Sequence, residues 1–493
     1  MPKKGGLTKG KRLTQEEFDA AVKDMIKSLG LEGYEAVESV VEEYEMQGYS
    51  LDGIIKAVGG SDALESTPSA LCAKNLKENL DDKKAHEYLE LLSSAIDDLK
   101  ITLEDGEGAE QQQSLLAAAN FDSVQSLFRV CDICMEQDPP DERILFKALS
   151  TLQLQMDCEL ARDRFNECKG AKRLAPLLAS YRDNTFILES LLATVSLAGK
   201  EHEENKCNFM FHNLDEFIAS LLLDAHTDHD TIEGACLALR TLLTADDHRP
   251  TPHALEATFG GEFNKALTMD SHGVTAALVG AFRRHINAEP VVRCLCATLR
   301  KIALNDDICR KCVDDAECKC IGDLLSILRG DLRDEGKSKS KQEDHAILLL
   351  LKQLSACDQV KRELVHLGFV PLAVTLLRRY RLDKAVTLAN LFVMTNVTLR
   401  NREVAEAFAD EGGFAQVFVV SDRYCGESAK LMKQVCMLVR NAAVRSDKVR
   451  RVLREEGDME SVLRAARDKH RKECLDAATA ALRDMGVQDY RAR

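Results

Sequence analysis

The sequence contains no tryptophan, and proline is scarce, with 9 residues in a chain of 493. Scarce proline removes the commonest interruption of helices, and the composition is rich in helix-forming residues. No segment alternates polar and apolar residues for long enough to predict a sheet. The longest apolar run, Ala346–Leu351, is far shorter than the roughly 20 residues of a membrane span. We therefore expect an all-helical protein without a membrane partner.

The sequence also lacks the short motifs of common catalytic sites. It has no phosphate-binding loop, dinucleotide fingerprint, nucleophile elbow or H-E-x-x-H helix. Two groups of residues resemble metal ligands: Cys309, Cys312, Cys318 and Cys320, and the histidines and aspartates of 226–253. Packing of cysteine inside a repeat and ordinary loop polarity explain both groups. We expect no enzyme activity and no cofactor, with a zinc- or redox-dependent protein as a third alternative.

Charge and cysteine content bear on partners and location. The net charge is −15, and residues 13–110 alone contain 24 acidic and 8 basic residues. This distribution argues against nucleic-acid binding. Seventeen cysteines are spread along the chain, and no apolar core follows the five basic residues of 1–12. Free cysteines without a secretory signal favour the cytoplasm, with the nucleus as a second location. Residues 1–12 are expected to be a flexible tail.

Internal repetition is the main signal in the sequence. Similar apolar segments recur, and their third residues are spaced by 43, 47, 60, 52, 43, 45 and 43. Five of these intervals fall in the 40–47 residue range of HEAT and armadillo repeats. The two longer intervals coincide with insertions at about 246–272 and 331–343. The third residues are Thr151, Thr194, Thr241, Lys301, Gln353, Asn396, Asn441 and Asp484.

A glycine precedes an apolar helix in several units, where it allows a sharp turn between helices. These glycines are Gly170, Gly273, Gly368, Gly412 with Gly413, and Gly457. In the sixth unit, the pattern predicts helices near 384–399, 401–411 and 413–421. Three helices in each unit indicate the armadillo plan. We therefore predict an all-α, right-handed superhelical armadillo solenoid.

The predicted domain order has four parts. A tail (1–12) precedes a helical segment (13–58), a linker (59–84) and the repeat array (85–493). Thr14 and Glu17 form a possible capping box at the start of the helical segment. This acidic segment either caps the array or competes for its groove.

Two stretches at opposite ends of the chain resemble the armadillo repeat-containing protein 6 family. One is RLTQEEFDAAVKDMI (12–26) with residues 35–57, and the other is KQVCMLVRNAAV (433–444) with residues 465–487. The resemblance implies an armadillo array without known catalysis. It agrees with the repeat analysis, which does not depend on it.

The third helix lines the concave groove of armadillo arrays, where asparagines hold the backbone of an extended partner. An amide suits this role because it offers both a donor and an acceptor. The residue before each third residue is cationic in five of eight units, at Arg240, Arg300, Lys352, Arg440 and Arg483. The predicted partner-binding residues are Arg240, Thr241, Arg300, Lys301, Lys352, Gln353, Asn396, Arg440 and Asn441.

These residues predict a scaffold or adaptor that binds extended acidic or phosphorylated segments of a protein partner. Alternatively, the cations are ordinary exposed residues or form salt bridges between repeats. A second function class is a regulatory or chaperone-like subunit that acts through the convex face or the insertions.

Overall fold

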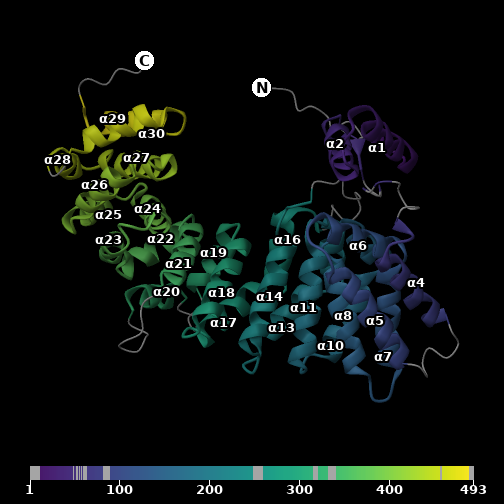
Figure 1. Ribbon diagram of the computed structural model, residues 1–493. Coiled ribbons are helices and arrows are strands. Elements are labelled where there is room, and N and C mark those ends of the chain that lie inside the picture. Colours follow the sequence, from purple (N-terminus) through teal and green to yellow (C-terminus); the bar gives the residue numbers. More distant parts are fainter. Residues whose placement is uncertain are drawn as a thin grey trace. The chain divides into compact units, whose positions relative to one another are not determined.

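The computed structural model describes residues 11–47, 49–51, 54, 56, 58, 64–81, 89–247, 259–314, 320–330, 340–455 and 458–487. They fall into two compact units (Figure 1). Unit 1 comprises Met1–Ile218 and Leu237–Lys265, and unit 2 comprises Ala219–Cys236 and Ala266–Arg493. Each unit is described by itself, and the described part of the chain is almost entirely helical, as predicted.

The N-terminal segment is a pair of helices, α1 (Gln15–Leu29) and α2 (Gly33–Met46). Two-residue strands flank the pair: β1 (Lys11–Arg12) pairs in parallel with β2 (Tyr49–Ser50). The predicted capping box is confirmed, because Thr14 Oγ1 accepts from the Glu17 amide at 3.3 Å and the Glu17 carboxylate accepts from the Thr14 amide at 2.9 Å. This segment has its own core, formed by Phe18, Val22, Ala36, Val37, Val40 and Leu51.

Helix α4 (Pro68–Asp81) lies inside the range that the sequence assigned to a linker. The linker prediction relied on the glycine, serine and proline residues of 59–69. Beyond them, Ala70, Ala73 and Leu76 recur at helical spacing and are fully buried. Helix α4 packs against the next three helices of unit 1. The array of unit 1 therefore includes a helix that precedes residue 85.

Among the described residues, unit 1 continues with eight helices, and three further helices contribute to both units. The eight are α5 (Leu89–Glu104), α6 (Ala109–Asn120), α7 (Ser123–Glu136), α8 (Glu142–Gln155), α9 (Glu159–Glu167), α10 (Gly170–Ser180), α11 (Thr185–Gly199) and α12 (Glu203–Phe211). The three shared helices are α13 (Leu214–Leu223), α14 (His229–Leu242) and α16 (Gly261–Ser271). Helix α16 begins a repeat within the range predicted as the first insertion, whose residues 248–258 lie outside the described part.

Unit 2 repeats the same order of a short first helix, a second helix and a long third helix. Its helices are α17 (Val274–Arg284), α18 (Glu289–Ile302), α19 (Asp306–Asp314), α20 (Cys320–Arg329), α21 (Lys341–Leu354), α22 (Asp358–His366), α23 (Phe369–Arg379), α24 (Lys384–Thr398), α25 (Arg402–Asp410), α26 (Gly413–Tyr424), α27 (Ala429–Ala443), α28 (Asp447–Glu455), α29 (Met459–Lys469) and α30 (Arg471–Asp484). The boundaries of α24, α25 and α26 confirm the three-helix prediction for the sixth unit.

The turn between first and second helices requires a left-handed residue, and the two units supply different ones. Unit 2 uses Gly273 (φ 81°) and Gly368 (φ 76°), as predicted. At the predicted Gly170, the preceding Lys169 takes the left-handed conformation (φ 57°). Gly170 is needed for another reason: a Cβ there would lie 2.5 Å from the Phe165 ring. Gly457 lies outside the described residues.

Candidate protein-binding face

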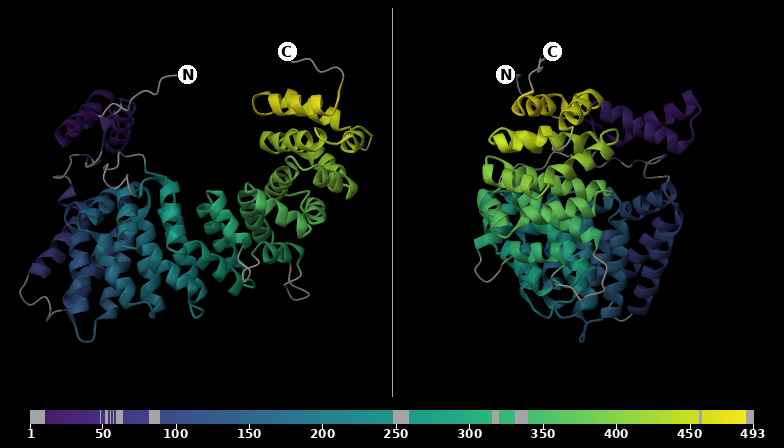
Figure 2. Two further views of the ribbon diagram at one scale, coloured as in Figure 1. Left: turned by 180° about the vertical axis from the view of Figure 1, so that it is seen from behind. Right: turned by 90° about the vertical axis from the view of Figure 1, so that its left-hand side faces the viewer.

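The long third helices of unit 2 stack one on the next, in the order α18, α21, α24, α27 and α30. They run from the teal-green to the yellow part of the chain in Figures 1 and 2. We call the partly exposed side chains on these five helices the long-helix face of unit 2. Seven of the nine predicted partner-binding residues lie on it, whereas Arg240 and Thr241 lie in the part of α14 that belongs to unit 1.

Amides on this face join each long helix to the one before it. Gln353 Nε2 donates to the Ala303 carbonyl at 2.8 Å, and Asn441 Nδ2 donates to the Thr395 carbonyl at 3.1 Å. Asn396 Nδ2 donates to Ser355 Oγ at 2.9 Å. These amides satisfy groups at helix C-termini, which lack partners within their own helix. In the described part of the chain, their side-chain carbonyl oxygens have no donor and stay available to a ligand.

Several cations on this face have no acidic partner among the described residues, and they include Arg300, Lys352 and Lys430. The Lys352 ammonium lies 4.1 Å from the centroid of the Phe392 ring. Burial, followed by repulsion from Lys430 and Arg300, lowers the pKa of Lys352. The protonated form of Lys352 is therefore destabilised in the folded protein, and an anion beside its ammonium group would reduce this destabilisation.

Arg440 behaves differently from these three cations. Its Nε lies 3.6 Å from Asp484, the acidic third residue of the last repeat. Arg483 Nε contacts the same carboxylate at 2.9 Å. The alternative prediction of salt bridges between repeats therefore describes Arg440, and one carboxylate partly compensates the two arginines at the C-terminal end of the long-helix face.

Sequence reasoning missed Lys430 and Phe392. Both lie on the face of their helix that carries Asn441 or Asn396, several residues earlier along the helix. Their positions could have been found by following the whole exposed stripe of each long helix. The aligned column of third residues contains neither of them.

The long helices of unit 1 also carry cations, but these are paired. Arg143 contacts Glu90 at 2.5 Å, and Lys147 contacts Asp97 at 2.5 Å, so α8 is tied to the acidic α5. At the aligned column, Thr151 and Thr194 are fully buried and donate to carbonyls of their own helices. In unit 1 these positions therefore serve the fold rather than a ligand.

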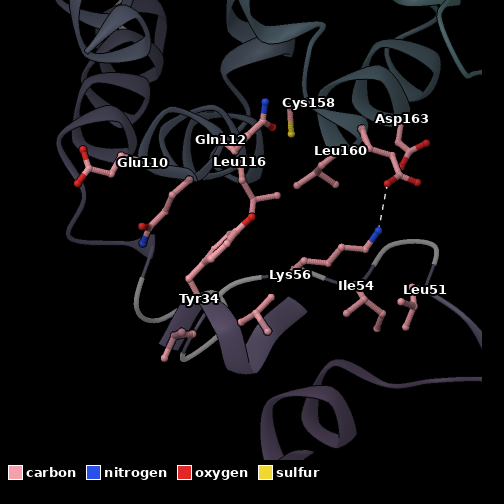
Figure 3. Close-up of a pocket in the computed structure, with 14 residues that line it drawn as sticks. Tyr34, Leu51, Ile54, Lys56, Glu110, Gln112, Leu116, Cys158, Leu160 and Asp163 are labelled. Atoms are coloured by element: carbon pink, nitrogen blue, oxygen red, sulfur yellow. Dashed lines mark hydrogen bonds and ion pairs between the residues drawn. The ribbon is translucent and has the colours of Figure 1, made fainter. Parts of the chain in front are cut away.

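A cavity of about 400 Å³ lies where the N-terminal segment meets α6 and α9 (Figure 3). Ile54, Leu116 and Leu160 point into it, and Lys56 pairs with Glu159 at 3.2 Å beside it. Helices α6 and α9 are the first helices of successive repeats. At this contact, the acidic N-terminal segment rests on first helices and not on the long helices of unit 1.

The surroundings of the cysteine cluster are those of packed core residues rather than of a metal site. Cys309, Cys312 and Cys320 are buried, and burial raises the pKa of the Cys309 thiol to about 12. Metal ligation requires thiolates, which such burial disfavours. Among the described residues, this cluster does not bring three ligand atoms within 4.8 Å of one another. Cys318, His248 and His253 lie outside the described residues.

Comparison with known proteins agrees with this architecture. Residues 10–84 match the family model of the armadillo repeat-containing protein 6 N-terminal domain. The chain is 26% identical to armadillo repeat-containing protein 6 of Pongo abelii over 371 residues, which cover 73% of this chain and 68% of that protein. The resemblance to this family is confirmed. The family model spans the N-terminal segment and α4, and the relative extends the likeness into the repeats.

Two solved structures share the fold. An engineered protein covers 84% of this chain, with a TM-score of 0.65 and 16% identity. A chain from a study of a phosphorylation switch in the interaction between cadherin and beta-catenin covers 97%, with a TM-score of 0.57 and 14% identity. The protein is thus an all-α armadillo-repeat solenoid. In the described part of the chain, no helix is long and apolar enough to cross a membrane.

Proposed function

We propose that this protein is a non-catalytic scaffold or adaptor that binds an extended acidic segment of a partner protein on the long-helix face of unit 2. Armadillo repeats typically mediate protein–protein interaction. The observation that carries the proposal is the set of Arg300, Lys352 and Lys430. Their charges have no acidic partner among the described residues, although the chain as a whole is acidic.

The chemistry of the face supports an acidic ligand. A carboxylate beside Lys352 would offset the repulsion from Arg300 and Lys430 that lowers its pKa. The side-chain carbonyls of Asn396 and Asn441 can accept backbone amides of the same segment. Together, cations and amides provide charge recognition and backbone recognition on one surface.

Charge reversal tests this proposal. Arg300→Glu/Lys352→Glu/Lys430→Glu is compared with wild type for binding a fluorescent peptide of alternating glutamate and serine, measured by anisotropy. We expect at least tenfold weaker binding, which corresponds to about 1.4 kcal/mol. The matched control is Arg143→Glu/Lys147→Glu, which reverses cations that are already paired and should change affinity less than twofold. Circular dichroism verifies that both variants keep their helices.

Equal affinity of wild type and the triple variant, or no binding by wild type, would overturn the proposal. Crosslinking of the full chain in cells provides an independent readout. Contacts concentrated on the second helices or near 246–272 and 331–343 would instead support the regulatory or chaperone-like alternative.

We also propose a cytoplasmic location, shared with the nucleus. The 16 described cysteines are free thiols, and most are buried, which suits a reducing compartment. Fractionation of cells that express the tagged full-length chain tests this. Recovery in a secretory compartment would contradict it.

A further inference from the structure

Three long helices of unit 2 carry the same basic–apolar–basic pattern at positions i, i+4 and i+7. This spacing places all three side chains on one helix face. The pattern comprises Arg293, Ala297 and Arg300 on α18, His345, Leu349 and Lys352 on α21, and Lys433, Met437 and Arg440 on α27. On α24 the same positions hold Leu388, Phe392 and Thr395.

The middle positions form a row of partly exposed apolar side chains, which we call the apolar row: Ala297, Leu349, Phe392 and Met437. Met437 is 39% exposed, although it belongs to a well-packed helix. Contacts between neighbouring helices keep the row in register. The Lys352 ammonium lies over the Phe392 ring, and the Asn396 and Asn441 amides tie α24 and α27 to the preceding long helices.

The cations beside this row are not equally available. Arg293 lies 3.8 Å from Glu289 on its own helix, and Arg440 pairs with Asp484. Burial and the charges of Arg300 and Lys341 lower the pKa of His345, against an opposing effect of Asp383. Arg300, Lys352 and Lys433 have no acidic partner among the described residues, so they supply the positive charge directly beside the apolar row, with Lys430 near the start of α27.

We infer that the partner segment is not simply acidic but carries apolar side chains that contact the apolar row, with carboxylates between them. This inference rests on the proposed function and specifies its ligand. Packed helices lie about 8–10 Å apart. A polyproline II segment rises about 3.1 Å per residue, with three residues per turn. Every third side chain then points to the same side, about 9 Å from the last, which matches one apolar contact per repeat.

The expected ligand therefore has an apolar residue at every third position and acidic residues at the two positions between. A purely acidic segment would satisfy the cations but leave the apolar row in water. An apolar segment without carboxylates would leave Arg300, Lys352 and Lys430 without counter-charges. Only the combined pattern matches both features of the face.

Three 12-residue peptides of equal net charge test the inference by anisotropy with the full-length protein. The first repeats Leu-Glu-Glu, the second replaces each leucine by serine, and the third keeps the composition of the first but groups the four leucines at one end. We expect the first to bind at least tenfold more tightly than either of the others, because burial of several leucines adds to the charge contacts. Leu349→Ser/Met437→Ser should remove this advantage.

Leu91→Ser/Ile101→Ser on α5 is the matched control, because it removes two exposed apolar side chains from a long helix of unit 1. It should leave the advantage of the first peptide intact. Equal binding of the leucine and serine peptides would overturn the inference and leave the proposed function standing. Equal binding of the first and third peptides would overturn the spacing of three. Binding that is unaffected by Arg300→Glu/Lys352→Glu/Lys430→Glu would overturn the proposed function itself.

Discussion

Units 1 and 2 are built from the same three-helix repeat, but they use the polar residues of their long helices differently. In unit 1, Arg143 and Lys147 pair with carboxylates of the preceding long helix. In unit 2, Arg300 and Lys352 have no acidic partner among the described residues. Pairing inside the protein leaves little charge for a ligand, so the two units differ in what they can bind although their backbones are alike.

Paired cations also occur in the interior of unit 1. Unit 1 buries two lysines, Lys206 and Lys265, which are almost inaccessible to solvent. Glu203 contacts both ammonium groups, and Asp246 contacts Lys206. Such groups are stable in the interior only while each charge is compensated. Unit 1 therefore uses these two lysines in its own packing. Unit 2 also buries two charged residues, Glu343 and Asp344, so the contrast between the units concerns the cations of the long helices.

The largest effect is predicted for a substitution that removes one carboxylate of this buried network. Glu203→Ala leaves Lys265 without its carboxylate and should lower the free energy of unfolding by about 3–5 kcal/mol, the usual cost of breaking a buried ion pair. Urea denaturation followed by circular dichroism measures the change. Glu167→Ala removes an exposed pair with Arg164 at 2.6 Å and should cost less than about 1 kcal/mol. Similar losses for both variants would show that the buried network is not a stability determinant.

The second prediction concerns a variant in which unit 1, like unit 2, has cations on a long helix without an acidic partner. Glu90→Gln/Asp97→Asn removes the carboxylates that neutralise Arg143 and Lys147. Introduced into the Arg300→Glu/Lys352→Glu/Lys430→Glu background, it should restore binding of the acidic peptide about tenfold, or about 1.4 kcal/mol. Anisotropy at low and high salt measures the gain, which salt should weaken. If binding does not return, charge pairing is not what distinguishes the two units.

The third prediction concerns the turns. Lys169 in unit 1 holds a left-handed conformation (φ 57°) that favours glycine, whereas Gly412 in unit 2 (φ 72°) already meets this need. Lys169→Gly should therefore stabilise the protein by up to about 1 kcal/mol, and Gly412→Ala should destabilise it by about 1 kcal/mol. Denaturation midpoints measure both. Changes of the same sign would contradict the assignment of strain to Lys169.

The sequence was sufficient for the repeat and its helix order because apolar periodicity and turn residues are local signals. It was not sufficient for charge pairing. Asp484 was visible at the end of the aligned column, but its contact with Arg440 depends on how side chains meet between neighbouring helices. The repulsion between Lys430 and Lys352 likewise joins helices two repeats apart, and no single segment of the sequence indicates it.

Helix α4 and Gly170 show a second limit of local patterns. The glycine, serine and proline residues before α4 resemble a linker, while the burial of Leu76 depends on helices that follow it. Gly170 resembles a turn residue in the sequence, but glycine is required there because the Phe165 ring leaves no room for a Cβ. Both are tertiary contacts, which a single segment does not encode by itself.

The smallest predicted effect compares one lysine from each unit. The pKa of Lys352 is lowered, so its protonated form is less favourable in the folded state than in the unfolded chain. Lys352→Met removes this cost and should stabilise the protein by about 0.5 kcal/mol at neutral pH, with the methionine packing on Phe392. The benefit should shrink as pH rises through the lowered pKa, because wild-type Lys352 then loses its proton. Lys147→Met instead removes an ion pair and should destabilise by about 0.5 kcal/mol. Parallel urea titrations at neutral and alkaline pH measure both changes. If both variants change the free energy of unfolding with the same sign, the contrast between the two units no longer rests on whether a cation has an acidic partner among the described residues.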